Sequence, residues 1–155
     1  MTSRACWPEP PMRAVRALLA GALALVAGLV AADAARADAA LAVGQPADVA
    51  KQGVAVGWAV DYLVRTEAEK EALARCRTFN DAVAAAREAC RIVETFRDSC
   101  LAVALDPERG TTGIGWGVHK NADWAEDAAM EKCESTSAPA RRASCRVALI
   151  RCDGR

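Results

Sequence analysis

A unit that occurs twice constrains the fold of this chain more than any other feature. Each copy has a Gly-Trp strand, a short helix that ends in cysteine, a loop, and a Cys-Arg pair that opens another strand. The copies span residues 57–93 and 115–148. Their helices match at a constant offset, with Ala68, Ala72, Leu73 and Cys76 corresponding to Ala125, Ala129, Met130 and Cys133. The repeat predicts one globular domain made of two related halves.

The first 37 residues have the pattern of a secretory signal peptide. A basic stretch follows Met12, an apolar run covers residues 17–32, and Ala35 and Ala37 stand where a signal peptidase reads small residues. A membrane anchor and a buried core helix are the alternatives, but the apolar run is shorter than the ~20 residues that a spanning helix needs. We therefore expect translation from Met12, cleavage before Asp38, and no membrane anchor in the exported chain.

Removing this leader leaves a nearly balanced charge. The leader takes four of the 20 basic and two of the 20 acidic residues, so residues 38–155 keep 16 and 18. This balance gives no electrostatic argument for binding nucleic acid or an anionic membrane. Residues 38–52 are alanine-rich and show no periodic pattern, so we expect a mobile N-terminal arm before a domain at residues 53–153.

Six of the seven cysteines remain after cleavage, and an even number in an exported chain indicates disulfides. The repeat suggests one disulfide in each copy, which leaves the third to join the halves: Cys76 with Cys90, Cys133 with Cys145, and Cys100 with Cys152. A zinc site is the alternative, but the spacings within the copies, Cys-x13-Cys and Cys-x11-Cys, are much longer than those of structural zinc ligands. We expect no metal and no cofactor.

The remaining pattern predicts an α+β domain. A capping box, Thr66 to Glu69, begins the first long helix, and Asp123 begins its counterpart. Apolar and β-branched residues predict strands at residues 54–64, 90–97, 100–105, 113–119 and 145–152. We expect a single mixed, largely antiparallel sheet with both helices on one face.

These residues resemble a known family. The Gly-Trp strands, the Ala-x-x-x-Ala-Leu-x-x-Cys helix and the segment from Cys90 to Ala104 are similar to the bacterial secreted family catalogued as domain of unknown function 4189. The resemblance covers about residues 53–153 and implies export and disulfides, but no catalytic residues. Family members often have a further strand before the first Gly-Trp strand, which we expect to be compressed here into residues 54–58.

Five residues are candidates for binding. The turn-rich connection at residues 106–113 forms an exposed hairpin loop that could present Asp106, Glu108 and Arg109 to a partner. Trp124, in the first turn of a helix, is a candidate aromatic anchor. His119 is the only histidine. It could serve as a general base, but an exposed histidine at a strand end is the favoured interpretation.

The sequence favours a binding protein over an enzyme. We expect an exported domain in the periplasm or outside the cell that binds an unidentified envelope or host protein, as a periplasmic inhibitor or immunity-type protein or as a secreted effector. The competing function is a cell-wall or peptide hydrolase that uses carboxylates. It would need Glu94, Asp98 and His119 to line one cleft. A structural envelope protein is a third alternative.

Overall fold

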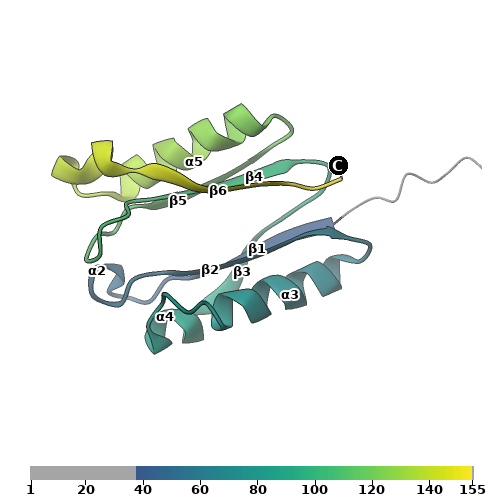
Figure 1. Cartoon of the computed structure of the whole chain (residues 1–155), viewed down its shortest axis with the longest axis horizontal. Helices are drawn as coiled ribbons and strands as arrows, with labels where there is room; N and C mark the ends of the chain where they lie inside the picture. The colour runs from purple at the N-terminus through teal and green to yellow at the C-terminus, as the bar shows by residue number, and fades with distance from the viewer. Residues whose placement is uncertain (1–37, 155) are drawn as a thin grey trace, which may run out of the picture. The chain divides into compact units, whose positions relative to one another are not determined.

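The computed structural model describes residues 38–154, which contain two copies of one β-β-α-β unit (Figure 1). The expected signal peptide lies outside the described residues. The first copy consists of β1 (Asp38–Gly44), β2 (Ala55–Tyr62), α3 (Arg65–Arg77) and β3 (Cys90–Phe96). The second consists of β4 (Cys100–Leu105), β5 (Ile114–His119), α5 (Ala122–Thr136) and β6 (Arg146–Cys152). Three short helices lie in the connections: α2 (Val49–Gln52), α4 (Ala84–Glu88) and the 3-10 helix η2 (Pro139–Ser144).

Each copy forms its own three-stranded antiparallel sheet, with its first strand in the centre. The strand orders are β2-β1-β3 and β5-β4-β6. The registers also correspond: Gly44 at the end of β1 lies between Ala55 and Cys90, and Leu105 at the end of β4 lies between Ile114 and Arg146. The repeat in the sequence is therefore a repeat of topology.

The two sheets pack face to face, and one helix covers the outer face of each sheet (Figure 1). The alternation of side-chain size along the central strands explains these layers. In β1, Leu41 and Val43 point to the other sheet, whereas Ala40 and Ala42 point to α3. In β4, Leu101 and Val103 point inward, and Cys100, Ala102 and Ala104 face α5. Bulky side chains thus fill the space between the sheets, and small ones let each helix approach closely.

Glycine makes this close approach possible in both copies. A Cβ built on Gly57 would lie 2.2 Å from the carbonyl oxygen of Ala72, and one built on Gly115 would lie 2.2 Å from that of Ala129. The neighbouring Trp58 and Trp116 pack at the margin of the inter-sheet core. The Gly-Trp pair therefore places a helix against one face of the strand and an indole on the other.

The α+β class and the two related halves are confirmed, but the single sheet with both helices on one face is wrong. The physical reason lies in the inner faces of the two sheets. Both carry bulky apolar side chains, which are covered when the sheets stack on each other, and each helix then packs on the remaining outer face. The sheets are separate because the first strand of each copy pairs on both sides with strands of its own copy.

The expected mobile arm at residues 38–52 is also wrong. Residues 38–44 form β1, the central strand of the first sheet, and all seven are buried. Residues 49–52 form α2, whose N-cap Asp48 accepts a hydrogen bond from the backbone N–H of Lys51. A strand before the first Gly-Trp strand, expected to be compressed into residues 54–58, is instead a separate strand, β1, ahead of β2. The strand is hard to recognise in the sequence because the β1 side chains that face α3 are small alanines, which give no β-branched pattern.

All three expected cysteine pairs form disulfides. Cys76–Cys90 and Cys133–Cys145 each tie the long helix of a copy to its last strand or the residue before it. Cys100–Cys152 joins β4 to its neighbour β6, so it lies within the second copy and does not cross between the halves as expected.

The helices of residues 38–154 include none that is both long enough and apolar enough to span a membrane.

Candidate binding site

One end of the sandwich is built from two repeat-equivalent hairpin connections. Residues 45–54, which contain α2, link β1 to β2, and residues 106–113 link β4 to β5. Both lie at the same end of the described unit (Figure 1) and line a common pocket, in which Val49 and Val54 of the first connection meet Leu105 and the 106–113 loop. We call this end the loop end.

Internal hydrogen bonds hold the 106–113 loop in one conformation. The backbone N–H of Asp106 donates to the carbonyl of Gly113 at 3.0 Å and closes the loop. A carboxylate oxygen of Asp106 accepts from the backbone N–H of Glu108 at 3.0 Å, and the Thr111 hydroxyl donates to the Glu108 carbonyl at 2.8 Å. These bonds leave Pro107, Glu108 and Arg109 exposed on a fixed backbone.

A side chain from a distant element completes this support. Arg141 of η2 donates from Nε to Asp106 Oδ2 at 2.8 Å and from Nη2 to Asp106 Oδ1 at 2.6 Å, and its Nη1 lies 2.5 Å from Glu108 Oε2. The Asp106 side chain is fully buried by this contact. The hydrogen bond from Arg141 lowers the pKa of Asp106, and the same bond raises the pKa of Arg141. Both groups therefore stay charged at neutral pH.

Arg109 stands at the tip of the loop between two small pockets. One pocket, of about 140 Å³, lies between the loop and residues Val49, Gly53 and Val54. The other, of about 180 Å³, is lined by residues 50–53, Asp81, Val83, Arg109 and Gly110. Pockets for drug-sized ligands usually measure roughly 300–1,000 Å³. Both are too small for such a ligand, but they suit single side chains of a bound polypeptide.

The other two candidates lie at the far end of β5. Trp124 is 61% exposed, and its ring centroid lies 4.6 Å from that of His119. The backbone N–H of Asn121 donates to His119 Nδ1 at 3.0 Å, and the Asn121 side chain caps α5 by accepting from the backbone N–H of Asp123 at 2.7 Å. The structure thus pairs Trp124 with His119 and separates both from Asp106, Glu108 and Arg109 by the length of a strand.

The residues of the competing hydrolase occupy separate places. Glu94 lies opposite Leu41 in the sheet, Asp98 lies in the turn after β3, and His119 ends β5. Asp98 lines a pocket of about 140 Å³ with Lys120 and residues from the strand ends, without Glu94 or His119. Within residues 38–154, no group of three His, Cys, Asp or Glu side chains is placed to hold a metal ion. Of the three residues, only Asp98 lines this pocket.

Sequence reasoning missed Arg141, the residue that holds the loop. It lies 35 positions from Asp106 in the sequence, in a short helix without a periodic pattern. No local motif connects the two residues. Only the stacking of η2 beside the β4–β5 connection brings them together.

A match to a family model identifies the family. Residues 28–152 match the family described as Domain of unknown function (DUF4189). The chain belongs to this family. The DUF4189 match includes β1, both copies of the β-β-α-β unit and all six disulfide-bonded cysteines. Neither the curated proteins nor the solved structures contain a match to the chain.

Proposed function

We propose that this chain is exported and acts by binding another protein through its 106–113 loop, as an inhibitor or immunity-type protein of the periplasm or as a secreted effector. The observation that carries the proposal is the contact of Arg141 with both Asp106 and Glu108, which fixes the loop from below. The three disulfides support export, because disulfides persist in oxidising compartments.

A loop that is ordered before binding favours tight recognition. Association costs conformational entropy for each segment that becomes fixed in the complex, and a preorganised loop avoids most of that cost. Here the side chain of Asp106 is used for internal support, whereas Pro107 and Arg109 face solvent. Inhibitors and other rigid binding proteins place contact residues on loops of this kind, which project from a stable scaffold. The small pockets beside the loop also fit a protein contact better than a substrate site.

Site-specific photo-crosslinking tests the proposal. A photo-reactive amino acid replaces Pro107 in the full chain, which is expressed in its native host, and envelope and culture fractions are irradiated. We expect a covalent adduct with one partner protein. The same replacement at Leu63 serves as the control, because Leu63 is 75% exposed and follows β2 at the opposite end. Absence of any adduct at Pro107, or the same adducts at both positions, would contradict binding through the loop.

The same material tests export and separates the two kinds of partner. We expect the intact mass of the exported protein to begin at Asp38 and its thiols to resist alkylation until reduction. Mass spectrometry of the adduct identifies the partner. An envelope hydrolase that loses activity when the purified protein is added supports the inhibitor, and a host protein supports the effector. A mass that retains residues before Asp38 would count against removal of the leader.

A further inference from the structure

In the 106–113 loop, the acidic side chains have an ion-pair partner within residues 38–154 and the arginine does not. Both of its carboxylates, on Asp106 and Glu108, contact Arg141. Arg109 is exposed and has no ion pair among the described residues, although it directly follows Glu108. Arg141 carries one positive charge for two carboxylates, so the four charged groups sum to zero, and the guanidinium of Arg109 is the charged group at the tip that lacks an ion pair in the described part of the chain.

The equivalent connection in the first copy provides an internal comparison. There, Lys51 and Asp48 form an ion pair at 3.0 Å, so the charges are matched locally. In the second copy, the partner of the acidic residues comes from η2, and this leaves Arg109 unmatched. An unpaired arginine is thus not a requirement of this hairpin connection, because the equivalent connection carries none.

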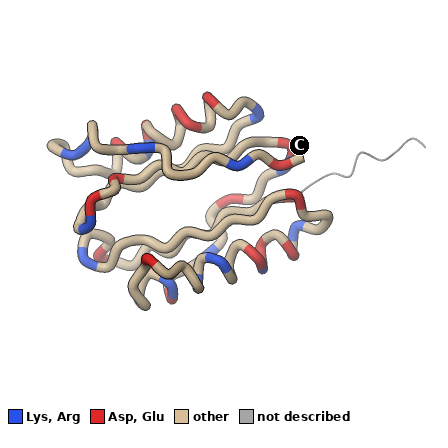
Figure 2. Tube along the Cα trace, in the orientation of Figure 1, with Lys and Arg blue, Asp and Glu red and all other residues tan. Residues whose placement is uncertain are grey.

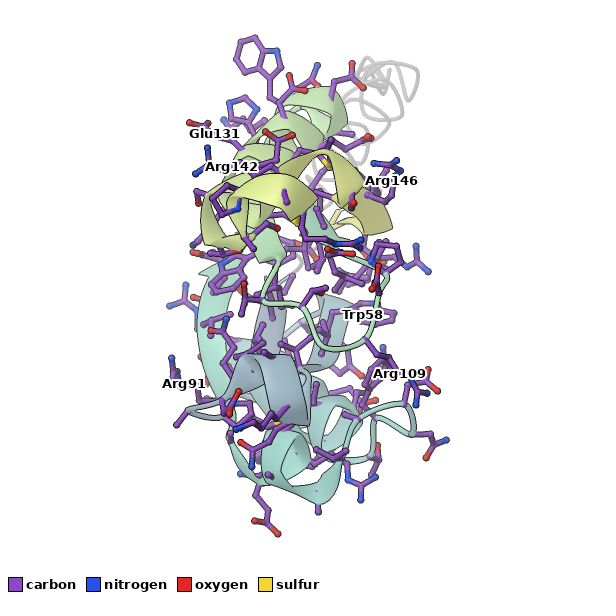
Figure 3. All side chains as sticks on the ribbon, turned by 90° about the vertical axis from the view of Figure 1, so that its left-hand side faces the viewer. Trp58, Arg91, Arg109, Glu131, Arg142 and Arg146 are labelled. Atoms are coloured by element: carbon purple, nitrogen blue, oxygen red, sulfur yellow. A yellow bond between two sulfur atoms is a disulfide. The ribbon has the colours of Figure 1, made fainter. Side chains whose placement is uncertain are left out.

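Three further arginines lie at the loop end. Arg91 is the second residue of β3, Arg142 belongs to η2, and Arg146 is the first residue of β6. Figure 3 looks onto this end and shows Arg109 and Arg146 on one side and Arg91 and Arg142 on the other. All are exposed, and none forms an ion pair within residues 38–154. We call these four residues the arginine rim.

Carboxylates are present near the rim but form no ion pair with it among the described residues. Asp81 shares the 180 Å³ pocket with Arg109, and Glu131 lies on the same side as Arg142 in Figure 3. Neither forms an ion pair in the described part of the chain. Figure 2 shows basic residues on several elements of the loop end, from the helices to the hairpin connections. Arg146 donates from Nη1 to the carbonyl oxygens of Ala143 and Cys145. The guanidinium groups of the other three rim arginines have no hydrogen bond among the described residues and are available to a partner.

We infer that the partner presents an acidic polypeptide segment to the loop end, with a carboxylate bound by Arg109. This inference rests on the proposed function and specifies the chemistry of its partner. The planar guanidinium group offers paired N–H donors that match a carboxylate in a fork. The other rim arginines steer the acidic segment towards the loop, because complementary charge raises the association rate.

The pockets favour a polypeptide over other anions. Val54 and Leu105 contribute apolar walls to the pocket on one side of the loop, and Val83, which is 50% exposed, contributes one on the other. These walls offer places for the side chains that flank the acidic residues. A free phosphate or a lipid headgroup has no side chains for such pockets.

Matched charge reversals test the inference. Arg109→Glu and Arg65→Glu change the net charge equally, but Arg65 is exposed at the start of α3, at the opposite end, and has no ion pair among residues 38–154. Each substitution is combined with the photo-reactive residue at Pro107. In low salt we expect Arg109→Glu to reduce the adduct yield about tenfold and Arg65→Glu to leave it within about twofold. Added salt should lower the yield of the unsubstituted protein.

A direct binding measurement complements the crosslinking. A hexaglutamate peptide should bind the full chain, lose affinity with Arg109→Glu, and keep it with Arg65→Glu, whereas a hexalysine peptide should not bind at the loop. Phosphatidylcholine vesicles that contain phosphatidylglycerol provide the lipid probe. Binding to those vesicles that depends on Arg109, without binding of hexaglutamate, would overturn the acidic-segment inference in favour of a membrane surface.

The outcomes separate the inference from the proposed function. An adduct at Pro107 that survives both Arg109→Glu and high salt would overturn the acidic partner and keep the binding loop. No adduct in the unsubstituted protein would instead overturn the binding loop. Equal thermal unfolding midpoints of the two reversals show that a lost adduct reports lost binding and not lost folding.

Discussion

Asp106 lies in the loop where the sequence predicts it, but its side chain supports the loop from within. Its position in a turn-rich loop made it a candidate for contact with a partner. The structure instead buries its carboxylate beneath the loop, where it accepts from Arg141 and from the backbone N–H of Glu108. The exposed neighbours Glu108 and Arg109 depend on this buried support. Asp106 thus fixes the shape of the loop.

Replacing Asp106 with Asn should reduce stability in a pH-dependent way. The hydrogen bond from Arg141 lowers the folded-state pKa of Asp106, so its stabilising contribution is fully present above the ordinary carboxyl pKa. The contribution is lost as the pH falls through the lower folded-state pKa. We therefore expect the difference in free energy of unfolding between the two proteins to be constant near neutral pH and to shrink in acid.

Urea unfolding between neutral pH and pH ~3 measures this difference. Asp81→Asn is the matched control, because Asp81 is exposed and has no hydrogen bond or ion pair within residues 38–154. Its difference from the unsubstituted protein should stay small at every pH. A difference for Asp106→Asn that grows in acid would refute the assignment of a stabilising buried carboxylate.

At the scale of the elements, the sequence was informative wherever the two copies are alike. The Gly-Trp strands, the helices that contain Cys76 and Cys133, and the disulfides Cys76–Cys90 and Cys133–Cys145 were predicted because each position has a counterpart. Cys100–Cys152 was predicted as the pair that remained. β1 was missed because its alternation of alanine with Leu41 and Val43 is weak. Without β1, β2 and β3 have no common neighbour, so the two separate sheets could not be predicted.

Gly115→Ala tests the close packing that the repeat imposes. A glycine-to-alanine change usually stabilises by roughly 0.4–1 kcal/mol when the backbone accepts it, since it restricts the unfolded chain. Here the new Cβ would lie 2.2 Å from the Ala129 carbonyl oxygen and 2.3 Å from the Cys133 nitrogen, so α5 must move away. We expect a loss of about 1–3 kcal/mol in the free energy of unfolding.

Gly57→Ala should behave in the same way, because its Cβ would approach Ala72 and Cys76 as closely. Thermal and urea unfolding of both variants provide the measurement. Similar losses would support equivalent packing in the two copies. A gain in stability for either variant would show that its helix does not rest on the glycine.

At the scale of the whole molecule, Asp153 links the two halves by hydrogen bonds at the end opposite the loop. We call Asp153 and its two donors, Asp61 and Asp98, the clasp. Asp153 Oδ1 accepts from the backbone N–H of Asp61 in β2 at 2.8 Å, and Asp153 Oδ2 accepts from that of Asp98 at 3.2 Å, in the turn between the halves. Asp61 and Asp98 both have positive φ, at 63° and 48°. The contact of Asp153 with Asp61 arises only when the halves are assembled, and that of Arg141 with Asp106 arises only when residues 35 positions apart in the second copy meet. The sequence therefore indicated the loop but not what orders it.

Asp153→Ala tests the clasp. Asp153 is 3% exposed, so its loss leaves two backbone N–H groups without their acceptor in a partly buried site. We expect a cost of about 2 kcal/mol in the free energy of unfolding, together with faster hydrogen exchange at the amides of Asp61 and Asp98. Asp153→Asn keeps one carbonyl acceptor and should fall between the two proteins.

Because the clasp lies far from the loop, Asp153→Ala should affect hydrogen exchange only at the clasp. The clasp and the 106–113 loop lie at opposite ends of the strands, and their hydrogen bonds share no residue. Asp153→Ala should therefore accelerate exchange at Asp61 and Asp98 and leave the amides of Asp106 and Glu108 protected. If all four amides accelerate together, the two halves open as one cooperative unit, and the clasp is not a local support. Selective acceleration would show that the loop stays ordered when the far end of the sandwich loosens, as a preorganised binding loop requires.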